Sequence, residues 1–324
     1  MELNEMDQFK KGFLDVFNFT LNEFALKKLT ELLSNPLNSK EKIYERQDII
    51  KAFIQNRKVF QNYFYHLTYL NASVELCQKT NFEDISAQLK GWWFLKDVSG
   101  KEIFKSKIKL FLLFFHRLQY SYFSKIKMDV FPITYQVVLK QMQKTIIDFT
   151  TVDYEELIRE NKFSTQHLKT VLNQLIEKTE SNELEAFWTN FLEIETYVSL
   201  AQAIFKNQFI FPKIGTNNLI LNGFYYPSLK DKVLNDVQIN DSVVLVTGPN
   251  MSGKSTLMKA LYLSVYLSHL GIGIPAASAS IPLFDGFFAR FNQTDDIGKG
   301  DSHFYKEIIS LKKVLNEVHS GKTY

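Results

Sequence analysis

The chain reads Val243-Val244-Leu245-Val246-Thr247-Gly248-Pro249-Asn250-Met251-Ser252-Gly253-Lys254-Ser255-Thr256 over residues 243–256. An apolar run rich in β-branched residues leads into the pattern Gly-x-x-x-x-Gly-Lys-Ser, and helical spacing follows from Thr256 to about His269. Strand, loop and helix in this order are the context that a phosphate-binding loop requires. The stretch therefore predicts an α/β domain that binds a nucleotide through its phosphates.

Each residue type in the loop has a physical task. Gly248 and Gly253 allow tight backbone turns that aim N–H groups at phosphate oxygens. The helix that begins near Lys254 adds the positive end of its dipole. Lys254 is expected to reach the β- and γ-phosphates of ATP or ADP, and Ser255 to ligate Mg²⁺. The predicted binding segment is Gly248, Pro249, Asn250, Met251, Ser252, Gly253, Lys254, Ser255 and Thr256.

The residues between the loop's fixed positions make the signal more specific. Thr247 to Thr256 resembles the T-G-P-N-M-x-G-K-S-T loop of the MutS family, the DNA mismatch-recognition ATPases. Residues 284–291, Phe-Asp-Gly-Phe-Phe-Ala-Arg-Phe, resemble the family's F-D-x-I-F-T-R-I strand. Residues 295–307 resemble its D-D-L…G-x-S-T-F-x-x-E segment, and residues 226–236 resemble its H-P-x-L…N-D lead-in. The resemblance covers residues 223 to about 310.

This resemblance implies further site residues. Asn235 matches the lead-in and is expected near the nucleotide. Ser302 matches the segment that, in the family, reaches the nucleotide of a partner subunit, which requires a homodimer. A second interpretation stays open, because Ser302 also stands where it would cap a helix from Phe304 to Val318 in its own subunit.

Composition sets broader bounds. The 324 residues are enough for two domains, and 45% hydrophobic with 23% charged residues is ordinary for a globular protein. The net charge of +3 does not by itself indicate nucleic acid. A single cysteine, Cys77, excludes an intrachain disulfide framework and suits the cytoplasm. No signal peptide or membrane-spanning run is evident, so no membrane association is expected.

The first two thirds of the chain predict a helical domain. Apolar residues recur with a period near 3.6, as in Thr165 to Lys178 and Glu183 to Leu200. We place the boundary near Pro212, with a helical core and lever domain at 1–212 and a P-loop ATPase domain at 213–324. Strands are expected at Leu219 to Leu221 and at Val243 to Thr247, the latter central and parallel because it is apolar throughout.

A segment near the N-terminus resembles the opening of the MutS lever helices. Leu32-Leu33-Ser34-Asn35-Pro36-Leu37 is followed by Ile43 and by Arg46-Gln47-Asp48-Ile49-Ile50, which is similar to the family pattern P-L…I…R-x-x-x-V. The same residues also describe an ordinary helix, a proline turn and a second helix.

Several family features are missing from these 324 residues. The mismatch-reading wedge G-x-F-[YF]-E does not occur, so mismatch recognition by this chain is not expected. The aromatic that stacks on adenine three residues before Asn235 is replaced by Lys232. After Lys254 no apolar strand ends in Asp-Glu, the pair that holds Mg²⁺ and polarises water. We therefore expect a fragment without hydrolytic activity, with the catalytic acids and dimerising helices beyond Tyr324.

Positive charge gathers in one part of the helical region. Residues 101–150 contain nine Lys or Arg against three Asp or Glu. The basic residues are interleaved with aromatic ones, which is consistent with a surface that contacts DNA phosphates. An amphipathic helix with a solvated lysine face and a phenylalanine core explains the pattern equally simply, and we favour it. His116 and His66 have no ligand partner at metal-binding spacing and are interpreted as structural.

The sequence thus predicts an ATP-binding, DNA-engaging MutS-like ATPase of DNA repair or recombination, active in hydrolysis only when complete. An alternative is a nucleotide-gated scaffold that binds proteins or branched DNA and hydrolyses little ATP. A mechanical ATPase of the SMC or ABC type shares the loop, but its L-S-G-G signature does not occur.

Overall fold

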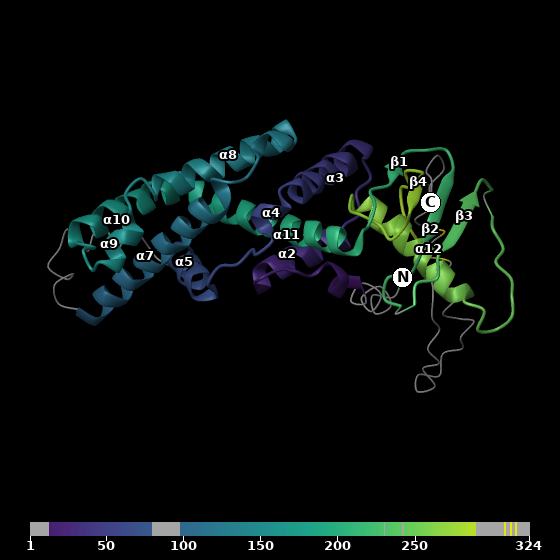
Figure 1. Cartoon of the computed structure of the whole chain (residues 1–324), viewed down its shortest axis with the longest axis horizontal. Helices are drawn as coiled ribbons and strands as arrows, with labels where there is room; N and C mark the ends of the chain where they lie inside the picture. The colour runs from purple at the N-terminus through teal and green to yellow at the C-terminus, as the bar shows by residue number, and fades with distance from the viewer. Residues whose placement is uncertain are drawn as a thin grey trace. The chain divides into compact units, whose positions relative to one another are not determined.

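A computed structural model describes residues 13–79, 98–229, 231–241 and 243–289, with single positions at 308, 312 and 315. The described chain is mostly helical and contains a four-stranded mixed sheet (Figure 1). Its contacts divide into two compact units. The first takes the described parts of 1–19, 26–54 and 197–324, and the second takes 20–25 and 55–196. The domain boundary near Pro212 stays a prediction.

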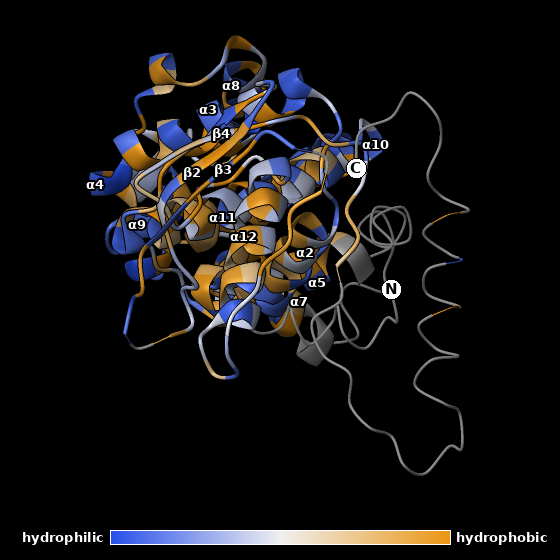
Figure 2. Cartoon of the chain, turned by 90° about the vertical axis from the view of Figure 1, so that its right-hand side faces the viewer, coloured by the Kyte–Doolittle hydropathy of each residue, from blue (hydrophilic) through white to orange (hydrophobic). Residues whose placement is uncertain are grey.

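The second unit is helical. Its elements are α4 (Arg57–Phe60), α5 (Leu67–Lys79), α7 (Val98–Leu118), the π-helical turn η2 (Gln119–Phe123), the short 3₁₀ helix η3 (Met128–Val130), α8 (Ile133–Asp148), α9 (Tyr154–Arg159), α10 (Thr165–Glu180) and the part of α11 (Glu183–Asn207) up to residue 196. Orange and blue residues alternate around the helices (Figure 2), as expected for helices with one buried face.

Aromatic rings fill the core of this unit. Phe111 and Phe115 lie with ring centroids 4.3 Å apart, and Phe115 also contacts Phe187 at 4.8 Å. All three side chains are at most 2% exposed. Phe111 and Phe115 of the basic, aromatic stretch therefore belong to a hydrophobic core, and their rings are not available for stacking on bases.

The first unit contains the sheet. Its helices are most of α2 (Glu23–Ser34), most of α3 (Lys40–Gln55), the end of α11 and all of α12 (Lys254–His269). The strands are β1 (Lys213–Ile214), β2 (Leu219–Phe224), β3 (Asn235–Ile239) and β4 (Ser278–Ile281), in the order β1-β4-β2-β3. β1 and β4 are parallel, whereas β2 is antiparallel to both β3 and β4.

The expected central strand at Val243 to Thr247 is wrong for this structure. Residues 243–249 have no strand assignment, and Val243 and Leu245 are each 85% exposed. An apolar run becomes a strand only when a neighbour satisfies its backbone N–H and C=O groups. Within the described residues no segment pairs with it. The parallel P-loop sheet consequently stays a prediction. The described residues form a mostly helical chain with a small mixed sheet.

Other expected elements are confirmed. The periodic segments at 165–178 and 183–200 are α10 and α11, and the helix after the loop is α12. The short expected strand at 219–221 is the first half of β2. Pro36 lies between α2 and α3, where it was expected to separate two helices.

Candidate nucleotide-binding loop

The loop at 248–253 turns sharply into α12. Gly253 is the N-cap of α12 and has φ +88°, a left-handed conformation that favours glycine. Met251 also has a positive φ, +65°, and its side chain is fully exposed. A Cβ built on Gly253 would meet no atom within 4 Å, so space beside the helix start is open. The backbone geometry fits an anion site at a helix N-terminus.

Lys254 folds back onto the loop. Its Nζ donates hydrogen bonds to the carbonyl oxygens of Gly248 and Pro249, both at 2.6 Å. The ammonium thus lies against the turn, and two carbonyl oxygens accept the hydrogen bonds that phosphate oxygens of a nucleotide would accept. Ser255 is exposed in the first turn of α12. A cation, a hydroxyl and a helix start therefore lie close together at this turn.

The opposite end of α12 is held by the segment around Pro36. The Tyr266 hydroxyl donates to the Leu33 carbonyl at 2.9 Å, and the Leu37 N–H donates to the His269 carbonyl at 2.7 Å. The Arg46 guanidinium donates to the Leu270 carbonyl at 2.8 Å. A cation on the last carbonyls of a helix also opposes the negative end of its dipole. The lever-like segment and the loop helix are consequently one connected structure.

Gly271 makes this close approach possible. It has φ +68°, and a Cβ there would lie 3.0 Å from the Ile43 carbonyl oxygen and 3.2 Å from the Arg46 Cβ. A glycine just after a helix commonly ends it in this left-handed conformation.

His269 is a buried anchor that sequence reasoning missed. Its Nε2 accepts from the Phe284 N–H at 3.0 Å, so the ring proton sits on Nδ1 and is shared with the Val265 carbonyl, also at 3.0 Å. The Phe287 ring packs edge-on against it at 4.6 Å. Burial lowers the pKa of His269, which keeps the imidazole neutral. No motif marks this histidine in the sequence, because its bond to Phe284 depends on how the chain returns to α12 after β4.

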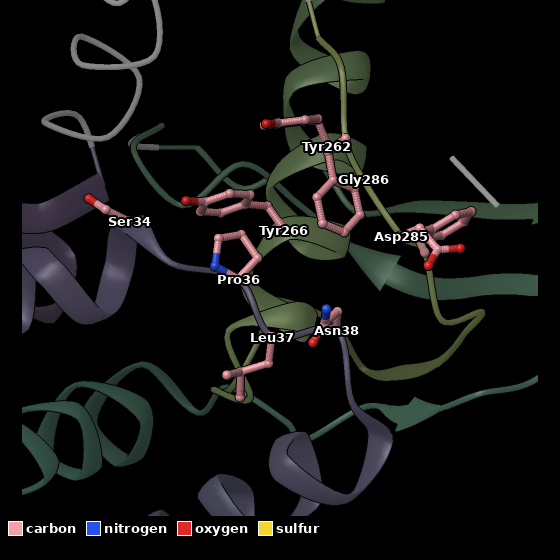
Figure 3. A pocket seen from close by; sticks show the side chains of 10 residues that line it. Ser34, Pro36, Leu37, Asn38, Tyr262, Tyr266, Asp285 and Gly286 are labelled. Carbon is pink, nitrogen blue, oxygen red and sulfur yellow. The ribbon is translucent and has the colours of Figure 1, made fainter. Parts of the chain in front are cut away.

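A cavity of about 290 Å³ lies beside this anchored end (Figure 3). Its lining residues are Ser34, Pro36, Leu37, Asn38, Tyr262, Tyr266, Phe284, Asp285, Gly286 and Phe287. None of them belongs to 248–256, so this cavity is distinct from the loop.

Of the two further site residues that the family resemblance implies, the structure describes Asn235 but not Ser302. The Asn235 amide donates to the Val233 carbonyl at 2.9 Å and to the Phe224 carbonyl at 3.4 Å, which shapes the start of β3. Lys232 lies 4.7 Å above the Tyr225 ring and contacts its hydroxyl. Ser302 lies outside the described residues, so its contacts stay a prediction.

The basic stretch is partly neutralised. Lys107 pairs with Glu75 at 3.1 Å, and Lys105 lies 4.0 Å from Glu102. Both pairs are partly exposed, where such contacts contribute little stability and are screened by salt. Lys125 and Lys127 are exposed at the turns that follow α7 and η2.

Comparison with known proteins gives a consistent result. Residues 244–322 match the family model described as MutS domain V. The DNA mismatch repair protein MutS of Clostridioides difficile (strain 630) is 25% identical over 86% of this chain and 33% of its own length. The chain belongs to the MutS family.

Other MutS proteins align with shorter parts of the chain. The DNA mismatch repair protein MutS of Thermus thermophilus is 29% identical over 60% of this chain and 24% of its own length. That of Acholeplasma laidlawii is 30% identical over 45% and 18%. The MutS-family chain thus spans about a third or less of these relatives.

The extent of the domain V match and the hydropathy of the helices add to this result. The domain V match begins at Val244 and includes the whole loop with its lysine. In the described part of the chain, no helix is both long and apolar enough to cross a membrane.

Proposed function

We propose that this MutS-family chain binds ATP or ADP with Mg²⁺ through residues 248–256 and couples the bound nucleotide to DNA engagement. The observation that carries the proposal is the loop itself. A lysine ammonium, an exposed serine hydroxyl and the N-terminus of a 16-residue helix, α12, meet at one turn. These are the groups that bind a nucleoside triphosphate in P-loop proteins.

The residues of the loop would act in sequence. Lys254 exchanges the Gly248 and Pro249 carbonyls for phosphate oxygens, because two anionic oxygens are stronger acceptors than two neutral carbonyls. Backbone N–H groups of the loop then donate to the phosphates, and Ser255 takes one position on Mg²⁺. Asn235, as the resemblance implies, would lie on the nucleoside side of the site.

Release of Lys254 gives a route from the nucleotide to the lever-like segment. The contacts of Leu37 and Arg46 hold the far end of α12, so a tilt of that helix would be passed to α3. The part of this route from the loop to α3 lies within the first unit.

DNA is proposed as the macromolecular partner because the MutS relatives are named DNA mismatch repair proteins. The candidate contacts are basic side chains on and after α7, which would neutralise phosphates without reading bases. These are Lys105, Lys107, Lys109, Arg117, Lys125 and Lys127. A homodimer, in which Ser302 reaches the partner's nucleotide, belongs to the same proposal for the complete protein, and ATP hydrolysis is likewise proposed for that protein.

The nucleotide-gated scaffold is retained as the second candidate function. Such a protein would bind nucleotide and change its grip on DNA or protein without turnover.

The test is the affinity for a short DNA duplex, measured by fluorescence anisotropy without nucleotide, with ADP and with Mg-ATP. We expect nucleotide to change the dissociation constant of the unmodified chain and to leave that of Lys254→Ala unchanged. Lys213→Ala removes the same charge from the exposed start of β1 and should behave like the unmodified chain. Equal DNA affinity in all nucleotide states would refute the coupling.

A further inference from the structure

Three side chains outside the region that matches MutS domain V converge in the helical unit. His116 comes from the last turn of α7, Asp153 is the N-cap of α9, and Glu155 lies in the first turn of α9. One ligand atom from each lies within 4.8 Å of the others. His116 has no ligand partner at metal-binding spacing in the sequence, but folding brings the start of α9 against α7 (Figure 1).

The possible metal-ligand atoms of this cluster do not bond to one another. Asp153 uses Oδ1 to accept from the Glu156 N–H at 3.0 Å, which leaves Oδ2 available. In the described part of the chain, no hydrogen bond or ion pair joins the His116 imidazole to either carboxylate. The imidazole stacks at 4.4 Å on Tyr120, which orients the ring. Two carboxylates and one imidazole therefore face a common point at the edge of solvent.

The spacing is slightly wider than that of an occupied site. Zinc binds imidazole nitrogen and carboxylate oxygen at about 2.0–2.2 Å, so ligand atoms around it lie roughly 3–3.5 Å apart. Side-chain rotations that move the ligand atoms by about one ångström would bring all three within coordination distance of one ion. His116 and Glu155 are half-buried and Asp153 is exposed, so an ion could enter without opening the core.

We propose that His116, Asp153 and Glu155 bind one divalent transition-metal ion, with water in its remaining positions. An imidazole with two carboxylates suits zinc, manganese or iron, whereas Mg²⁺ prefers oxygen ligands alone. The positive dipole end of the six-residue helix α9 repels a cation, but the two carboxylate charges attract it more strongly. The ion ties the C-terminal end of α7 to the start of α9.

The experiment is calorimetric titration of ZnCl2 into the chelator-treated 324-residue chain, repeated with MnCl2 and MgCl2. We expect one equivalent of zinc to bind, with magnesium at least tenfold weaker. His116→Ala and Glu155→Gln should each raise the zinc dissociation constant tenfold or more. Asp153→Ser should do the same while keeping the N-cap hydrogen bond. Glu156→Gln, at a neighbouring acid outside the cluster, should bind zinc like the unmodified chain.

Thermal unfolding followed by the fluorescence of Trp188, which lies in the same unit, gives an independent readout. Zinc should raise the midpoint of the unmodified chain and of Glu156→Gln, but not that of Glu155→Gln, which keeps the size of the half-buried side chain. Unchanged zinc affinity in His116→Ala and Glu155→Gln would overturn the proposal. Zinc binding that disappears on replacing Cys77 instead would overturn it as well.

Discussion

His269 offers the sharpest test of how the loop helix is held, and His269→Phe is the informative change. Phenylalanine keeps the ring volume beside Phe284 and Phe287 but removes both hydrogen bonds. An orphaned backbone N–H costs about 1–3 kcal/mol when buried, and a lost hydrogen bond about 0.5–1.5 kcal/mol. Because Phe284 is half-buried, water can reach its N–H, which places the total loss of stability at roughly 1–3 kcal/mol.

The same residue gives a pH dependence with a defined sign. Burial lowers the pKa of His269 below its ordinary value of 6.5, so the unfolded state takes up a proton before the folded state does. Its contribution to stability is therefore present above about pH 6.5 and is lost as the pH falls through the folded-state pKa. The unmodified chain should lose stability between pH 7.5 and pH 5, and the variant should lack this component.

Hydrogen exchange of peptides that cover α12 is the suitable assay. The three tryptophans, at positions 92, 93 and 188, all fall within 55–196, so fluorescence reports on the other unit. Protection of α12 should drop in His269→Phe at pH 7.5, whereas His66→Gln should leave it unchanged. Equal protection in variant and unmodified chain at pH 7.5, or an identical loss of protection on acidification, would show that the His269 hydrogen bonds do not hold α12.

Three further outcomes are expected. Arg46→Ala removes the charge-assisted hydrogen bond to the Leu270 carbonyl and should lower the stability of α12 by about 1.5–3 kcal/mol. The same exchange assay measures this loss, and unchanged protection of α12 would contradict it. Replacing the lysines at 105, 107 and 109 with glutamate should weaken duplex binding and flatten the plot of log K against log salt by about 0.9 per lost phosphate contact, and a salt-independent preference for a mismatch would contradict this. The 324-residue chain should not hydrolyse ATP above background in a phosphate-release assay, and turnover near the ~1–100 s⁻¹ typical of phosphoryl transfer would show that another carboxylate acts.

The sequence predicted those features that depend on local patterns. Helical periodicity located α10 and α11, and the Gly-Lys-Ser pattern located the start of α12. The Val243 to Thr247 segment could not be decided in this way, because a strand depends on a pairing partner that the local pattern does not contain. Composition indicated a lysine-rich face and a phenylalanine core in α7, and the buried rings of Phe111 and Phe115 agree with it.

Features built from distant residues were out of reach. The Arg46 hydrogen bond joins residues 224 positions apart, and the His269 hydrogen bond joins α12 to the segment after β4. Neither pair follows a regular spacing that could be recognised in the sequence. The cluster around His116 has the same origin, since its acids belong to another helix. The loop differs because glycine, lysine and serine at fixed spacing encode its chemistry within ten residues.

The most direct test of the nucleotide-binding claim is calorimetric titration of ADP and Mg-ATP into the 324-residue chain and its Lys254→Ala variant. We expect measurable, phosphate-dependent binding to the unmodified chain, because Lys254 would exchange two loop carbonyls for phosphate oxygens. In Lys254→Ala we expect the affinity to fall about tenfold or more, with Lys213→Ala unaffected. Equal nucleotide affinity in Lys254→Ala and the unmodified chain would contradict the assignment of the loop.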